Sequence, residues 1–206
     1  MSGRLHIGTS GFSYKDWQSI FYPAHLPKDK WLNFYSKNFS TVELNNTFYH
    51  LPKEQTFKKW QAIVPRDFLF SVKASRFITH IKRLRDFRSA LRLFLKRAKL
   101  LKNHLGPILF QLPPSMKIDL DRLKEFIKLL PKKFSYSVEF RNGSWFDEKV
   151  YDALRKNNIS FCIFDMPKVK CPWVLTSDFV YIRMHGKTSL YSSLYTCLLY
   201  TSPSPR

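Results

Sequence analysis

Short runs of β-branched and aromatic residues alternate along this chain with longer segments in which apolar residues recur every three or four positions. Runs of the first kind predict β-strands, and segments of the second kind predict amphipathic helices. We expect seven strands, at Leu5–Thr9, Thr41–Asn45, Phe68–Lys73, Ile108–Leu112, Ser135–Phe140, Ser160–Asp165 and Phe179–His185. Between them we expect helices near Lys30–Phe39, Glu54–Ile63, Arg85–Lys102, Leu120–Leu130 and Glu148–Asn157.

Aspartates and prolines mark several of these boundaries. Asp119 and Asp147 each precede a helical period, where a carboxylate can accept hydrogen bonds from the first backbone N–H groups of the helix. Pro107 and the Pro113–Pro114 pair bracket the fourth strand, which indicates chain turns at both of its ends.

Seven strands that alternate with helices predict a parallel sheet covered by helices, either closed as a barrel or open and doubly wound. A dinucleotide-binding sheet needs a glycine-rich GxGxxG turn directly after its first strand. The segment Gly8-Thr9-Ser10-Gly11-Phe12-Ser13 lacks that pattern. We therefore favour an α/β fold of the TIM-like (β/α) barrel type.

Nearly every expected strand ends in a polar or charged residue. Side chains alternate along a strand, so Glu43 and Asn45 share one face, as do Arg183 and His185. If these faces point inward, their groups meet at the C-terminal mouth of the barrel, where such folds place their chemistry. Aromatic residues in the following loops suit stacking on a sugar or a nucleobase. The predicted ligand-binding residues are Ser10, Tyr14, Asn45, Tyr49, Lys73, Gln111, Arg141, Trp145, Asp165 and Arg183.

Three residues of this set are candidates for catalysis. Glu139 lies among other charges, where acid–base work is expected, and Glu43 is a second carboxylate. His185 is the best candidate for a proton shuttle, with a hydrogen-bonded structural histidine as the alternative. Glu139 and Arg141 could instead form an ion pair that braces the rim.

Lys73 has three interpretations. It could form a Schiff base or hold an anion, but we favour a salt bridge to Glu43 or Glu139. A divalent metal could also be held by oxygen and imidazole ligands from several strands, namely Glu43, Glu139, Asp165 and His185. No HxxE or HxH spacing supports this, so no metal site is predicted, and the residues identify no cofactor.

Composition places the chain among globular proteins. It has 206 residues, of which 44% are hydrophobic and 17% aromatic, enough for a single domain with a substantial core. Three cysteines without CxxC spacing argue against a disulfide framework or a zinc site and fit a reducing cytosol. No run approaches the roughly 18–20 apolar residues of a membrane span, and a strand is expected almost at the N-terminus. We therefore expect a cytoplasmic protein with no membrane partner.

The net charge of +20 raises the question of a nucleic-acid partner. Much of it lies in Ile81–Lys102, where basic residues recur at helical spacing beside an apolar stripe. We favour a solvated helix face over a binding patch, and nucleic-acid binding stays open. The basic positions are Arg85, Arg88, Arg92, Lys96 and Lys99, and the apolar ones are Leu84, Phe87, Leu91, Phe94, Ala98 and Leu101.

Five short motifs occur in order along the chain: Gly8–Tyr14 with Trp17 and Phe21-Tyr22-Pro23, Glu43–Tyr49, Leu109–Pro114, Glu139–Arg141 with Ser144-Trp145, and Tyr181–Gly186. From about residue 4 to 195 the chain thereby resembles the domain of unknown function 72 family, also called YecE-like. The resemblance implies a TIM-like barrel and no established reaction.

The end of the chain departs from that family pattern. The family supplies a further helix and an eighth strand after Gly186, whereas Cys197–Arg206 has neither helical nor strand period. We expect a YecE-like barrel domain over residues 1–195 and a non-native-looking tail over 196–206. The barrel is then incomplete, with about seven strands and the last strand and helix missing.

Three functions fit these residues. The first is an enzyme or ligand-binding protein for a small anionic or sugar-like molecule, with acid–base chemistry by Glu139 and His185. The second is nucleic-acid binding or processing through the basic surface and the aromatic residues. The third is a non-catalytic binding protein on a barrel scaffold.

Overall fold

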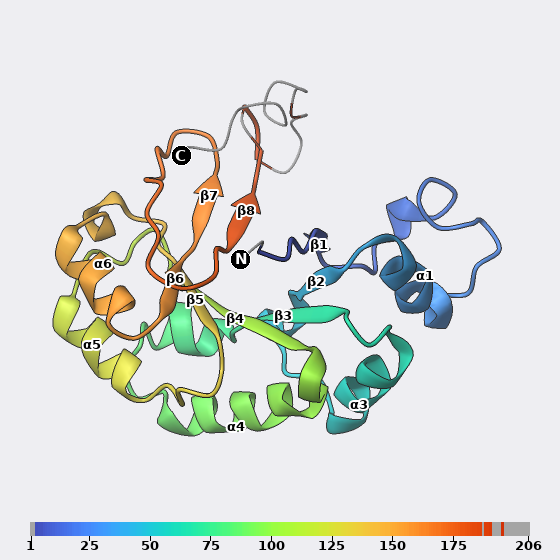
Figure 1. The fold of residues 1–206 in the computed structure, drawn as a ribbon, viewed down its shortest axis with the longest axis horizontal. Helices are drawn as coiled ribbons and strands as arrows, with labels where there is room; N and C mark the ends of the chain where they lie inside the picture. The colour runs from blue at the N-terminus through green and yellow to red at the C-terminus, as the bar shows by residue number, and fades with distance from the viewer. Residues whose placement is uncertain (1–2, 187, 191–194, 196–206) are drawn as a thin grey trace.

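The strands of the protein form a curved parallel sheet with helices along its outer side (Figure 1). The computed structural model describes residues 3–186, 188–190 and 195. Six strands pair in sequential order: β1 Gly8–Ser10, β2 Thr41–Leu44, β3 Leu69–Lys73, β4 Leu105–Gln111, β5 Tyr136–Glu139 and β6 Ile159–Phe161. A second parallel pair is formed by β7 Ile163–Asp165 and β8 Ile182–Met184.

The predicted helices are confirmed to within a few residues at each end. They are α1 Trp31–Asn38, α3 Glu54–Ile63, α4 Arg88–Ala98, α5 Leu120–Lys128 and α6 Glu148–Arg155, with a short α2 at Asn46–Tyr49. Asp119 accepts a hydrogen bond from the backbone N–H of Arg122 at 3.0 Å, and Asp147 accepts one from Lys149 at 2.8 Å, so both predicted N-caps are confirmed. Short turns of 3₁₀ or π type complete the elements: η1 Lys15–Trp17, η2 Lys28–Lys30, η3 Phe77–Ile81, η4 Lys99–His104 and η5 Gly143–Trp145.

The basic segment forms an amphipathic helix docked on the sheet, as predicted. All six residues of its apolar stripe are buried, and its five basic residues are exposed. Burial of that stripe against the sheet holds α4 in place and leaves the basic face outside.

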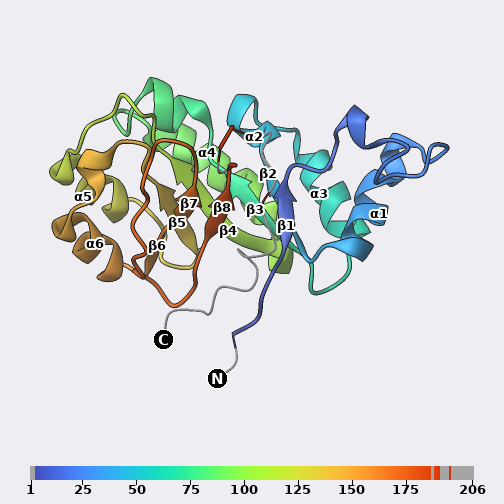
Figure 2. The same cartoon turned by 90° about the horizontal axis from the view of Figure 1, so that it is seen from above.

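The sixth predicted strand is interrupted at Cys162 and changes partner there. The backbone N–H of Cys162 still donates to Val138 of β5 at 2.9 Å, whereas the N–H of Ile163 donates to Tyr181, beside β8, at 2.9 Å. β6 and β7 are therefore consecutive parts of one extended segment, of which the first part pairs with β5 and the second with β8. Such a stagger between neighbouring strands is typical of a curved, sheared sheet. In two perpendicular views β8 lies between β7 and β1 (Figures 1 and 2).

The first strand begins later than predicted. β1 covers Gly8–Ser10, while Leu5 and Ile7 are 77% and 59% exposed. A Cβ atom on Gly8 would lie 1.9 Å from the carbonyl oxygen of Thr41, so only glycine allows the two backbones to meet here.

Pro107 lies inside β4 and does not precede it, which corrects the boundary expected from the prolines. The pairing of β3 with β4 shifts register between Phe70 and Val72, opposite this proline. Proline cannot donate a ladder hydrogen bond and is accommodated at such irregularities. The Pro107 carbonyl instead accepts a hydrogen bond from Ser71 Oγ at 2.9 Å.

The fold is thus α/β, with a sheet whose sequential order shows no reversal of the kind found in doubly wound sheets. Within the described residues no ladder joins β8 to β1, and closure into a barrel stays a prediction. The tail predicted for residues 196–206 lies outside the described residues, as does most of the chain after Leu190.

Candidate functional site

The polar strand ends do meet at one rim of the sheet, because all the strands run parallel. Ser10 of β1 pairs with Glu43 of β2, and Gln111 of β4 pairs with Glu139 of β5. Lys73 is the last residue of β3. The strand pairing therefore places the predicted groups side by side.

Arg183 of β8 connects the two glutamates. Its Nε and one terminal nitrogen lie 2.9 and 2.7 Å from the two oxygens of Glu43, and its other terminal nitrogen lies 2.6 Å from Glu139 Oε2. All three side chains are buried. Although burial by itself lowers the pKa of Arg183, the charges of Glu43 and Glu139 raise it above the ordinary value. The arginine is permanently charged and neutralises carboxylates from two separate strands.

The second oxygen of Glu139 is also fully occupied. Oε1 accepts from Gln111 Nε2 at 2.9 Å and forms an ion pair with Arg141, and His185 Nε2 lies 3.5 Å away. Burial acts to raise the pKa of Glu139, but the His185 hydrogen bond and the charges of Arg183 and Arg141 outweigh it and hold the pKa well below the usual range. Glu139 is therefore an ionised carboxylate that positions cations.

His185 lies between the two arginines. Its Nε2 is 2.9 Å from a terminal nitrogen of Arg141 and 3.4 Å from one of Arg183. Glu139, Arg141, Arg183 and His185 thus form one connected group, which with Glu43 we call the charged cluster.

Lys73 does not form the salt bridge that we favoured. Among the described residues no carboxylate lies within 4.0 Å of its ammonium, because Arg183 and Arg141 already occupy both glutamates. Its Nζ instead lies 4.2 Å from the centroid of the Phe48 ring. Burial, and then the charge of Arg183, lower the pKa of Lys73 to about 8.

Further residues join the site that the sequence reasoning missed. The Tyr181 hydroxyl lies 2.8 Å from Glu43 Oε2 and 2.6 Å from Ser71 Oγ, so it contacts Glu43 from the residue directly before β8. Tyr181 stands two and four positions before Arg183 and His185, so the alternation along the strand could have identified it.

His80 of η3 packs edge-on against the same Phe48 ring, with the ring centroids 5.0 Å apart. Burial, and then the charge of Lys73, lower the pKa of His80 to about 4. Arg76, Arg141 and Arg83 act in the same direction, which indicates a positive potential around this imidazole. No local sequence pattern predicts that His80 lies next to Lys73 and Phe48, because η3 lies beyond the end of β3.

Other predicted residues lie at the outer rim of the charged cluster. Burial raises the pKa of Tyr14, as does the charge of Glu43, and its hydroxyl donates to the Ser10 carbonyl. Tyr49 is 69% exposed. Asn45 Oδ1 is buried and accepts no hydrogen bond from the described residues. Asp165 ends β7 and is half-buried.

Trp145 is placed in the core. Its indole is fully buried, stacks on Phe140 with centroids 4.8 Å apart, and donates from Nε1 to the Met116 carbonyl at 2.7 Å. With its ring and its N–H both engaged by the protein, Trp145 braces the loop after β5, and we do not include it in the proposed site.

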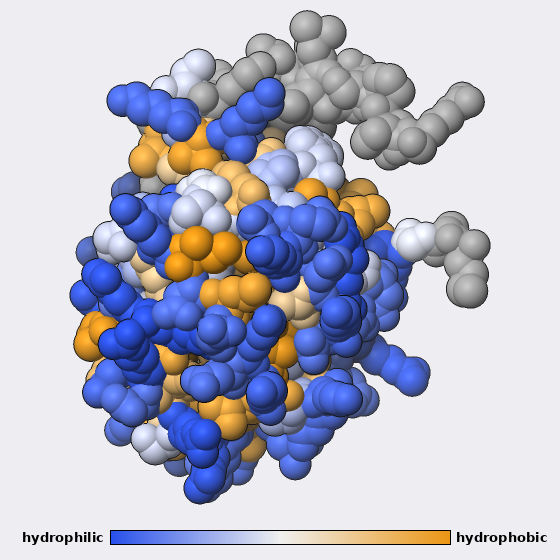
Figure 3. Space-filling view, turned by 90° about the vertical axis from the view of Figure 1, so that its left-hand side faces the viewer, coloured by the Kyte–Doolittle hydropathy of each residue, from blue (hydrophilic) through white to orange (hydrophobic). Residues whose placement is uncertain are grey.

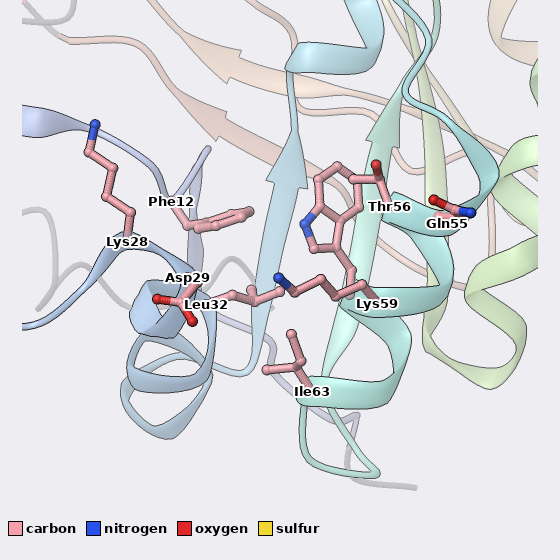
Figure 4. Close-up of a pocket in the computed structure, with 9 residues that line it drawn as sticks. Phe12, Lys28, Asp29, Leu32, Gln55, Thr56, Lys59 and Ile63 are labelled. Atoms are coloured by element: carbon pink, nitrogen blue, oxygen red, sulfur yellow. The ribbon is translucent and has the colours of Figure 1, made fainter.

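Two surface cavities lie away from the charged cluster. One, of about 470 Å³, lies between α5 and α6, on a face that is largely hydrophilic with small apolar patches (Figure 3). The other, of about 420 Å³, lies between α1 and α3, with Phe12, Leu32 and Ile63 as its apolar wall (Figure 4). Neither is lined by a member of the charged cluster.

Within the described part of the chain, no three His, Cys, Asp or Glu side chains are grouped so that they could hold a metal ion. No helix there is long and apolar enough to cross a membrane.

Comparisons with known proteins agree on one family. The family described as protein of unknown function DUF72 matches residues 6–200. The UPF0759 protein YecE of Escherichia coli is 30% identical over 143 residues, which cover 69% of this chain and 50% of that protein. The UPF0759 protein YunF of Bacillus subtilis is 28% identical and covers 89% of this chain and 70% of that protein. The chain therefore spans about half the length of YecE.

Solved structures show the same fold. A DUF72 family protein from Thermotoga maritima superposes with a TM-score of 0.82 at 32% identity, over 93% of this chain and 81% of that one. A DUF72 family protein from Enterococcus faecalis superposes with a TM-score of 0.73 at 20% identity, over 88% and 70% of the two chains.

Proposed function

This chain belongs to the DUF72 family of proteins of unknown function, and we propose that it binds a small anionic molecule, a carboxylate or phosphate, at the C-terminal ends of its strands. The proposed scaffold is a TIM-type barrel. The sequential strand order supports it, as do the contacts of β8 with the far side of the sheet, where Arg183 lies 3.4 Å from Ser10 Oγ of β1.

One observation carries the proposal: Lys73 has a positive charge that no described carboxylate neutralises. The two buried glutamates are held by Arg183 and Arg141, so the ammonium remains as a surplus cation beside them. The lowered pKa of His80, to about 4, supports a positive potential at the same place. A half-buried cation in such surroundings favours an anionic ligand.

The arrangement also supports acid–base chemistry centred on His185. Its imidazole contacts Glu139 and Arg141, so its orientation is set by charged neighbours. We assign His185 the proton transfer, while Glu139 and Glu43 hold the cations in place. If His185 transfers a proton to or from the bound molecule, the protein is an enzyme. If it does not, the same charged residues bind the ligand without a reaction.

Thermal unfolding with added anions tests the proposal. Phosphate, glycerol phosphate, citrate and glycolate should raise the unfolding midpoint, and neutral glycerol and glucose should not. At a hundredfold excess over Kd, binding adds about 2.7 kcal/mol, which for a chain of this size is a rise of roughly 5–10 °C.

Two variants locate the effect. Lys73→Met should abolish the anion-dependent rise. Lys133→Met is the matched control, because Lys133 also lies over a phenylalanine ring, at 5.2 Å from the Phe134 centroid, but precedes β5 at the opposite rim. If Lys73→Met responds to anions as the native chain does, the proposal is wrong.

Nucleic-acid binding is the second proposal, supported by unpaired basic residues on the outer surface. Arg88, Arg92 and Lys96 of α4 are exposed and form no ion pair with a described carboxylate. Four lysines line the cavity between α5 and α6. Retention on immobilised DNA or RNA should fall steeply with salt if phosphates are bound. Unchanged retention after charge reversal at Arg88, Arg92 and Lys96 would exclude the α4 face. The lining lysines are Lys124, Lys128, Lys149 and Lys156.

A further inference from the structure

The amine of Lys73 differs from the other cations of the site because it is nucleophilic and forms no ion pair with a described carboxylate. Arg141 and Arg183 carry guanidinium groups, which stay protonated and are held by carboxylates. Among the described residues, Lys73 Nζ packs on the face of Phe48, 4.2 Å from the ring centroid, and its side chain is half-buried, so a small molecule can reach it from the rim.

We propose that Lys73 forms a Schiff base with an aldehyde or ketone group of a small carboxylate- or phosphate-bearing molecule. This inference rests on the proposed function, because the exposed Arg76 and Arg83, whose charges act on His80 beside the same Phe48 ring, would hold the anionic group while the amine reacts. It adds that the ligand carries a carbonyl group and that binding is covalent.

The reaction balances with the lysine, the carbonyl compound and one proton. The lone pair of neutral Nζ attacks the carbonyl carbon, and the carbonyl oxygen takes up a proton to give a carbinolamine. Loss of that oxygen as water, with its second proton coming from Nζ, leaves a protonated imine between Nζ and the former carbonyl carbon. No oxidant or reductant is consumed.

The surroundings of Lys73 favour the uncharged amine that this reaction needs. Burial and the charge of Arg183 lower its pKa to about 8, so that at neutral pH about one amine in ten is uncharged, against fewer than about one in a thousand for an ordinary lysine. His80 packs against the same Phe48 ring. Burial and the charge of Lys73 lower the pKa of His80 to about 4, so its imidazole is uncharged at neutral pH.

Reductive trapping with glyoxylate tests the inference. Glyoxylate is the smallest aldehyde that carries a carboxylate, and glycolate has the same charge and size without the carbonyl. The full chain is incubated with glyoxylate and cyanoborohydride near neutral pH, and adducts are quantified by peptide mass spectrometry. We expect the Lys73 adduct to form at least about tenfold faster than the adduct of Lys133, which lies over a ring at the opposite rim.

Glycolate and the variant Lys73→Arg separate this inference from the proposed function. Lys73→Arg keeps the positive charge, so glycolate should still raise its unfolding midpoint, while the adduct at position 73 is lost. A glycolate effect with equal labelling of Lys73 and Lys133 would overturn the Schiff base and leave anion binding standing. Failure of both glycolate stabilisation and selective labelling would overturn both.

Discussion

Replacing Arg183 by methionine removes the one side chain that neutralises two buried carboxylates. Methionine fills a similar volume but cannot donate to Glu43, which is 6% exposed, or to Glu139, which is fully buried. Three contacts of 2.6–2.9 Å would be lost at once. The variant Arg183→Met therefore tests whether the charged cluster holds β8 against the rest of the sheet.

The expected cost follows from burial of unpaired charge. Removing one partner of a buried ion pair costs about 3–5 kcal/mol. Because Glu139 keeps its ion pair with Arg141, we expect a loss of stability near the middle of that range. Because whole domains are stable by about 5–15 kcal/mol, the loss is large. With a urea dependence of about 2–3 kcal/mol per M, the unfolding midpoint should fall by roughly 1–2 M.

Urea unfolding followed by circular dichroism measures this change, with Arg92→Met as the control. Arg92 is exposed on α4 and forms no ion pair with a described residue, so its replacement should change stability by less than about 0.5 kcal/mol. A loss below about 1 kcal/mol in Arg183→Met would refute the reasoning, since it would mean that the carboxylates are solvated.

The pH dependence of the stability of Arg183→Met provides a second test. Without Arg183, one of the charges that lower the pKa of Glu139 is gone while burial still raises it, so this pKa rises above its native value. The buried carboxylate then takes up a proton more readily, and the variant should regain stability relative to the native chain as pH falls. A variant whose stability does not rise relative to the native chain on acidification would also count against the account.

Three further predictions concern single residues. In the native chain the pKa of Glu139 is lowered, so its contribution to stability is complete above the ordinary glutamate pKa and is lost as pH falls below it; acid unfolding of Glu139→Gln should be less steep. Trp145→Phe removes the hydrogen bond to Met116 and leaves a small cavity, which should cost about 1–3 kcal/mol in urea unfolding. Anion-dependent stabilisation should be unchanged in that variant, whereas its loss would place the indole at the ligand. Gly8→Ala forces a methyl group against the Thr41 carbonyl, so β1 should detach and the segment before it should be cleaved faster by proteases. Equal cleavage rates would show that the two backbones can separate without consequence.

The sequence by itself determined the elements and their chemistry. The helices Glu54–Ile63 and Glu148–Arg155, the caps at Asp119 and Asp147, and the buried stripe of α4 all follow from local periodicity and capping. The polar strand ends followed as well, because parallel strands bring their carboxyl ends to one rim. These features depend on residues a few positions apart, which a single chain displays directly.

Only the tertiary structure decided which charges meet. The sequence paired Lys73 with a glutamate, but the guanidinium of Arg183 reaches both Glu43 and Glu139 from β8 with several donors at once, which a single ammonium cannot do. As a result, Lys73 forms no ion pair with a described carboxylate, and Trp145 lies in the core. Such outcomes depend on strand stagger and on distances across the curved sheet, where residues more than a hundred positions apart compete for the same partner.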